Sequence, residues 1–142
     1  MISDSDYAVR IFAKIVPIQQ VLEINKFGHR LLKGKDNLLY YIIYKREPFH
    51  SFGDIFGNNE GYGESINVEF LDYCIDRKVH YICFIYQFYK DGQVYIIEPQ
   101  KFKELGKIRT TKQFVSEIVY GQERRKQEVT YSISMKELER IE

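Results

Sequence analysis

The side chains best suited to metal chemistry lie in a glycine-rich stretch between residues 48 and 65. This stretch and its flank, residues 51–70, contain no lysine or arginine and four acidic residues: Asp54, Glu60, Glu64 and Glu69. Glycine lets the backbone approach a metal ion or a phosphate closely, and carboxylate oxygens are the ligands that hard divalent cations prefer. The stretch is therefore a candidate metal or ligand loop, and the alternative is a solvated surface loop.

Metal-dependent phosphodiester cleavage would draw on this loop and on the strand before it. Such chemistry uses carboxylates around a cation and a nearby lysine or histidine that activates water or stabilises charge. We predict a Mg²⁺ ion held by Glu64 together with Asp36 or Asp54. Lys45, at the end of the preceding strand, is the expected charge stabiliser. His50, at the start of the loop, and Glu64 complete the catalytic candidates.

A cluster of basic residues in the last third of the sequence forms a second candidate site. Residues 101–142 carry ten lysine or arginine residues and seven glutamates, a net charge of +3, although the whole chain has a formal charge of only +1. Basic side chains neutralise phosphates and position nucleic acid. The candidate contacts lie before a predicted hairpin, on its first strand and in its polar tip at 121–126, and are Lys107, Arg109, Lys112, Arg124, Arg125 and Lys126. The alternative is a charged hairpin that only improves solubility.

Length and composition limit the class of protein. The chain has 142 residues, of which 44% are hydrophobic and 29% charged, which suits one folded domain and argues against disorder. No window approaches the roughly 20 apolar residues that span a bilayer, and no leader-like segment opens the sequence. We therefore expect a soluble, cytoplasmic protein. Cys74 and Cys83 have apolar neighbours and no zinc-ligand spacing, so we expect two buried thiols.

The hydrophobic pattern predicts a single α+β domain with a mostly antiparallel or mixed sheet. Apolar residues three and four apart from Val9 to Leu22 favour a helix bent or interrupted at Pro17, although the alternation from Val9 to Ile15 also permits a strand in that part. Ser65 or Asn67 is expected to cap the second large helix. The other predicted elements are strands at 27–32, 38–45, 79–88, 94–99, 112–120 and 127–134, and helices at 67–78, 99–106 and 134–142.

This order of elements, with acids beside a lysine at the end of a strand, resembles the restriction-endonuclease-like (PD-(D/E)XK) nucleases. Small archaeal Holliday-junction resolvases are the members most similar in size, and the resemblance runs from about residue 7 to residue 99. It implies that Glu23 is the helix acid, that Asp36 is the turn acid, and that Lys45 belongs to the acid-x-Lys pair. The position that this pair fills with an acid holds Ile43. The resemblance thus implies either that Glu64 replaces the missing acid or that the domain is a non-cleaving relative.

Three hypotheses for the function of this nucleic-acid-acting candidate stay open. The first is a metal-dependent DNA endonuclease-like domain or a degenerate relative of one. The second is a module that binds DNA through the basic residues without catalysis. The third is a virus- or plasmid-encoded interaction or assembly factor, a homodimer formed by exposed sheet edges. The aromatic strands at 40–44 and 81–89 either stack on bases or fill the core.

Overall fold

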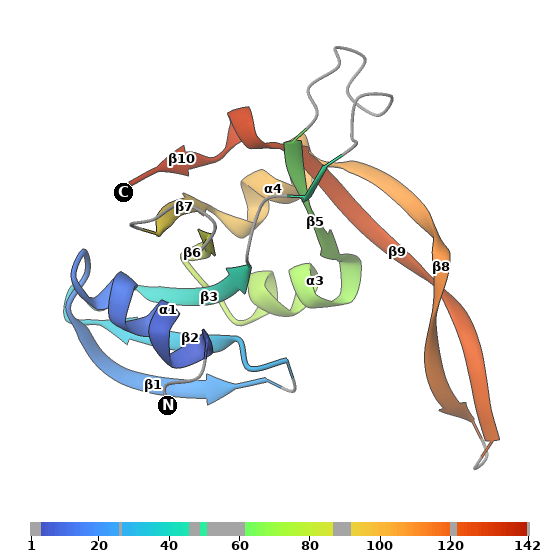
Figure 1. Ribbon diagram of the computed structural model, residues 1–142, viewed down its shortest axis with the longest axis horizontal. Coiled ribbons are helices and arrows are strands. Elements are labelled where there is room, and N and C mark those ends of the chain that lie inside the picture. Colours follow the sequence, from blue (N-terminus) through green and yellow to red (C-terminus); the bar gives the residue numbers. More distant parts are fainter. Residues whose placement is uncertain are drawn as a thin grey trace.

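Six strands form one mixed sheet in the described part of the computed structural model (Figure 1). Their order is β1-β2-β3-β6-β7-β10, and the only parallel neighbours among them are β3 and β6. The strands are β1 (Ile18–Ile24), β2 (Arg30–Gly34), β3 (Leu39–Lys45), β6 (Tyr81–Tyr86), β7 (Gln93–Ile97) and β10 (Glu139–Arg140). The structure describes residues 4–25, 27–45, 49–50, 62–86, 92–119 and 122–141, with the backbone alone for residues 4–5, 49–50, 62, 109–119 and 122–128.

The centre of this sheet is the parallel pair of β3 and β6. β3 lies at the predicted strand 38–45 and buries side chains on both faces, as a central strand covered on both sides does. Because successive side chains of a strand point to opposite faces, Tyr41 and Ile43 join one hydrophobic cluster and Tyr40 and Ile42 join another. The same alternation in β6 puts Ile82, Phe84 and Tyr86 in the cluster that contains Tyr41 and Ile43.

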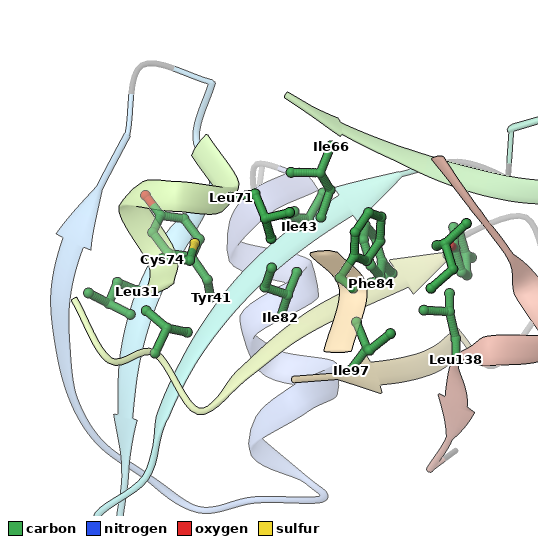
Figure 2. Close-up of a cluster of buried hydrophobic side chains, with 14 residues drawn as sticks. Leu31, Tyr41, Ile43, Ile66, Leu71, Cys74, Ile82, Phe84, Ile97 and Leu138 are labelled. Atoms are coloured by element: carbon green, nitrogen blue, oxygen red, sulfur yellow. The ribbon is translucent and has the colours of Figure 1, made fainter. Parts of the chain in front are cut away.

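The fold class is α+β, as predicted, and helices cover both faces of the six-stranded sheet. α1 (Asp4–Ala13) packs on one face, where Phe12 contacts Tyr40. α3 (Val68–Asp76) and α4 (Pro99–Leu105) contribute Leu71 and Phe102 to the cluster on the other face. Figure 2 shows this second cluster, in which Leu71 and Cys74 of α3 lie over the strands that carry Tyr41 and Ile82.

The predicted helix from Val9 to Leu22 is only half right. α1 ends at Ala13, so the alternation from Val9 to Ile15 did not produce a strand there, and the residues after Pro17 form β1, where the sequence had predicted more helix. Proline has no backbone N–H and disfavours helical geometry in the residue before it. The Pro17 carbonyl instead accepts a hydrogen bond from the Lys35 N–H at 2.8 Å, which ties the chain to the β2–β3 turn.

Local rules place the starts of α3 and α4 correctly, but the helix predicted at the end of the sequence is largely wrong. The Asn67 side chain caps α3 by accepting a hydrogen bond from the Glu69 N–H at 2.8 Å. α4 begins at Pro99, as predicted, although Gly106 at its end is extended. The predicted helix at 134–142 shortens to one 3-10 turn, η1 (Met135–Glu137), capped by Ser134 and followed by β10.

The edge strand β1 exposes apolar side chains. Val21 and Leu22 are both more than 40% exposed, and Ile24 is 57% exposed. β1 also pairs with β2 in an irregular register, with two shifts along its length, and such irregularities discourage uncontrolled edge pairing. The predicted homodimer stays a prediction, because the structure describes one chain.

A second, four-stranded sheet carries a long hairpin away from the helices (Figure 1). Its order is β4-β5-β9-β8, and all its neighbouring strands are antiparallel. The strands are β4 (Phe49–His50), β5 (Tyr62–Asn67), β8 (Lys107–Val119) and β9 (Gln122–Ser134). β8 and β9 pair from Lys107–Ser132 to Val119–Gln122 with one register shift. We call this two-stranded hairpin the arm.

Both cysteines are buried and unbridged, as predicted. Burial and the charge of Glu23 raise the pKa of the Cys74 thiol to about 12. Burial also raises the pKa of Cys83. None of the helices in the described residues is long and apolar enough to cross a membrane.

Phe12 and Phe27 offer a matched test of where the core lies. Phe12 is fully buried with its ring centroid 4.9 Å from that of Tyr40, whereas Phe27 is 69% exposed. We expect Phe12→Ala to lower the free energy of unfolding by about 3–5 kcal/mol, and Phe27→Ala to change it by less than about 0.5 kcal/mol. Urea unfolding followed by circular dichroism measures both values. Equal losses would contradict this description of the core.

Candidate functional site

The candidate site begins with two neighbouring strand ends. Lys45 is the last residue of β3, and it stands in register with Tyr86, the last residue of β6. Strand alternation puts Lys45 on the same face as Tyr41 and Ile43, and Tyr86 on the same face as Ile82 and Phe84. The two side chains therefore meet on the face that α3 covers.

β5 brings a carboxylate to this point. Glu64 is fully buried, and its Oε2 lies 2.5 Å from Nζ of Lys45. The Tyr86 hydroxyl donates a hydrogen bond to Oε1 of Glu64 at 2.9 Å, and its oxygen also lies 3.6 Å from Sδ of Met135. The Lys45 side chain keeps 32% of its surface exposed. The structure thus brings together two of the predicted catalytic residues, Lys45 and Glu64.

The burial of the Glu64 carboxylate requires partners for its negative charge. A carboxylate without a partner in the interior loses its hydration at a cost of several kcal/mol. An ammonium group and a phenolic donor, one on each oxygen, compensate that loss for Glu64. The three residues, which we call the Glu64 cluster, come from three strands of two different sheets.

Other predicted site residues do not reach this cluster. Asp36 lies in the turn before β3, so the length of that strand, about 20 Å at about 3.3 Å per residue, separates it from Lys45. There Asp36 accepts hydrogen bonds from the Tyr40 hydroxyl at 2.6 Å and from the Leu38 N–H at 3.0 Å. The structure therefore does not place Asp36 where it could share a metal ion with Glu64.

The structure does not describe the side chains of the remaining metal and catalytic candidates, His50 and Asp54. His50 pairs with Tyr62 through the backbone of β4 and β5, and its side chain is not described. Asp54 lies outside the described residues. Within the described part of the chain, no three His, Cys, Asp or Glu side chains gather as a metal site would require.

Glu23 belongs to a strand, β1, and not to the helix that the resemblance implied. Its carboxylate accepts hydrogen bonds from the Tyr41 hydroxyl at 3.1 Å and the Tyr73 hydroxyl at 2.5 Å, and it lies 3.8 Å from the Arg77 guanidinium. Burial and the charge of Glu23 raise the pKa of Tyr41. Glu23 therefore joins β1 to β3 and α3, and this tyrosine pairing gave no signal in the sequence.

A cavity of about 180 Å³ opens beside Lys45. It is lined by the β1–β2 turn, by strands β3, β5 and β6 and by the first turn of α3. Its lining residues include Phe27, His29, Lys45, Ser65, Asn67 and Phe70. Ile43, at the acid position of the family pattern, also lines the cavity. Sequence reasoning missed this site because it predicted a strand at 27–32, where the structure has the turn from Asn25 to Gly28 that forms one wall and β2 begins only at Arg30. Asn and Gly, which favour turns, were the signal that could have found it.

His29 is the titratable neighbour of Lys45 in this cavity. Burial, and then the positive charge of Lys45, lower the pKa of His29 from its ordinary value of 6.5. The imidazole is therefore mainly neutral at pH 7, with one nitrogen that donates and one that accepts a hydrogen bond.

All six predicted nucleic-acid contacts lie on the two strands of the arm. Lys107 opens β8 and is exposed, at the base of the arm opposite Ser132. Arg124, Arg125 and Lys126 pair with Glu117, Ser116 and Val115, toward the far end of the hairpin. For Arg109, Lys112, Arg124, Arg125 and Lys126 only the backbone position is described.

Comparison of the chain with protein-family models, with curated proteins and with solved structures finds no match.

The hydrogen bond from Tyr86 to Glu64 can be tested against a matched control on the neighbouring strand. Tyr86→Phe removes a donor to a buried carboxylate, and we expect it to lower the free energy of unfolding by about 1.5–3 kcal/mol. Tyr95→Phe removes a 3.1 Å hydrogen bond to the neutral Gln93 side chain and should cost about 1 kcal/mol or less. Urea unfolding measures both. A smaller loss for Tyr86→Phe than for Tyr95→Phe would contradict the Glu64 cluster.

Proposed function

We propose that this protein binds double-stranded DNA through its arm. The observation that carries the proposal is the placement of all six basic candidates on one hairpin that projects from the helices and sheets (Figure 1). Residues 107–134 contain six lysine or arginine residues and three glutamates, a net charge of +3. An extended ribbon with this charge is a suitable shape for following a phosphate backbone.

The dimensions of a two-stranded ribbon support this proposal. The major groove of B-DNA is about 12 Å wide and admits a two-stranded β-ribbon. Lysine and arginine along the ribbon would neutralise phosphates and release counterions, which provides affinity without reading sequence. The glutamates of the arm weaken that attraction, so we expect moderate binding that depends strongly on salt.

Charge removal at the far end of the arm tests the proposal. We expect the triple variant Arg124→Ala/Arg125→Ala/Lys126→Ala to weaken duplex binding. We also expect it to reduce the slope of log affinity against log salt by up to about 2.7, since each phosphate contact contributes about 0.9. Fluorescence anisotropy of a labelled duplex between about 50 and 200 mM salt measures both.

A charge-matched control distinguishes the effect of the arm from the effect of removing three positive charges anywhere on the protein. Lys14, Lys35 and Lys101 are exposed and lie outside the arm, on or near α1, the β2–β3 turn and α4. Replacing all three with alanine removes the same charge and should leave the salt slope within error of the wild-type value. Equal losses in the two triple variants, or binding that ignores salt, would contradict the proposal.

Metal-dependent cleavage of the bound DNA is the second candidate function, and one contact favours it. Glu64 places a carboxylate on Lys45, beside the Ile43 position where the family pattern expects an acid. The order of a helix, a hairpin, a helix across the sheet and further strands also supports the resemblance to the restriction-endonuclease-like nucleases.

The described residues alone do not complete the magnesium site that this candidate needs. Glu64 offers one carboxylate, and both of its oxygens are already bonded to Lys45 and Tyr86. Mg²⁺ is usually held by one or two carboxylates together with substrate phosphates and water. Glu64 would therefore have to exchange these contacts for the metal ion when DNA arrives.

A cleavage assay decides between binding alone and cleavage. If the second candidate is right, the wild-type protein nicks supercoiled DNA with Mg²⁺ or Mn²⁺, and Glu64→Gln, which keeps the shape of the side chain, abolishes nicking. Asp36→Asn, at the far end of β3, is the control and should retain it. Equal nicking by wild type and Glu64→Gln would remove Glu64 from the chemistry, and no nicking by a protein that binds DNA would reject cleavage.

A further inference from the structure

We infer that the cavity beside Lys45 accepts a single unstacked nucleobase from bound DNA, with Phe27 stacking on it. This inference rests on the proposed DNA binding and adds what the arm cannot provide, a preference for DNA that contains an unpaired base. Four features of the cavity support it: its size, the exposure of Phe27, the charge balance of its walls and its polar groups.

The size of the cavity suits one flat ring. Cavities that enclose a drug-sized ligand usually measure about 300–1,000 Å³, whereas this one measures about 180 Å³. It is therefore too small for a whole nucleotide with its sugar and phosphate. Aromatic side chains at Phe27 and Phe70 supply walls of the kind on which a base stacks.

Phe27 is a large aromatic side chain that is mostly exposed to solvent. It is 69% exposed, the highest exposure among the large hydrophobic residues of the described chain. Its turn is built to hold it there, because Oδ1 of Asn25 accepts hydrogen bonds from the N–H groups of both Phe27 and His29, at 2.9 and 3.0 Å. Gly28 completes the turn with φ of +81°, a conformation that other residues rarely adopt. A stacked base would cover the exposed ring.

The charges around the cavity favour a neutral occupant over a free phosphate. Lys45 is its cationic group, and Glu64 already balances that charge at 2.5 Å. His29 is mainly neutral at pH 7, because burial and Lys45 lower its pKa. A base is uncharged, so it brings no unpaired charge into the cavity. The phosphates of the same DNA strand can stay in solvent or on the arm.

The polar groups are suited to the edge of a base. The neutral His29 ring both donates and accepts hydrogen bonds, and its ring centroid lies 6.0 Å from that of Phe27. Asn67 contributes an amide side chain that is held in place by its capping of α3. These groups resemble those with which proteins read unpaired bases, by stacking on one face and by hydrogen bonds at the edge.

A pair of matched duplexes tests the inference with the full-length protein. One duplex is fully paired, and the other carries one bulged 2-aminopurine, whose fluorescence falls when it stacks. We expect the wild-type protein to bind the bulged duplex about 10-fold more tightly and to quench the 2-aminopurine. Phe27→Ala should lose most of this preference while its affinity for the paired duplex stays unchanged, and Phe27→Trp should retain it.

Controls make each outcome decisive. Ile24→Ala removes a similarly exposed side chain of β1 that does not line the cavity, and it should keep the preference. Equal affinity of the wild type for the two duplexes, or a preference that survives Phe27→Ala, overturns the base pocket and leaves DNA binding by the arm intact. Failure to bind either duplex overturns both proposals. Equal quenching of free 2-aminopurine nucleoside monophosphate would assign the cavity to free nucleotides and overturn its role in DNA.

Discussion

The buried carboxylate of Glu64 is the constraint on which the arrangement of the two sheets depends. A charge at that depth is tolerated only with partners on its oxygens, and the partners come from β3 and β6 of the six-stranded sheet. Glu64 itself comes from β5 of the four-stranded sheet. Because β5 pairs with β9, the same contact fixes where the arm leaves the rest of the molecule.

The same pairing sets the electrostatics of the neighbouring cavity. Lys45 is partly exposed and would otherwise present a bare positive charge there, which would attract phosphate. With Glu64 on its ammonium group and with His29 neutral, the wall is polar and nearly balanced in charge. The arm, in contrast, has an excess of basic residues. The molecule therefore separates a basic arm from a cavity whose described charges are nearly balanced.

Local patterns predicted the elements better than the site. The capping by Asn67, the start of α4 at Pro99 and the covered strand β3 follow from residues within a few positions of each other. Asp36 was correctly expected in a turn, but an antiparallel hairpin puts that turn at the end of β3 remote from Lys45, so chain proximity misled the metal prediction. The contact of Glu64 with Lys45 and the tyrosine partners of Glu23 depend on pairings between distant segments, such as β5 with β9, which no short pattern encodes.

In the Glu64 cluster, stability of the fold and cleavage chemistry make opposite demands on Lys45. While Lys45 stays on Glu64, the carboxylate is satisfied and the fold is stable, but neither group is available to a metal ion or a phosphate. Releasing Lys45 would take its positive charge away from a fully buried carboxylate that the Tyr86 hydroxyl also contacts, and removing one partner of a buried ion pair costs several kcal/mol. Only a ligand that supplies an equivalent positive charge at Glu64 can offset that cost. A base in the adjacent cavity makes no such demand, so base binding is compatible with the fold as it stands, whereas cleavage requires the cluster to open.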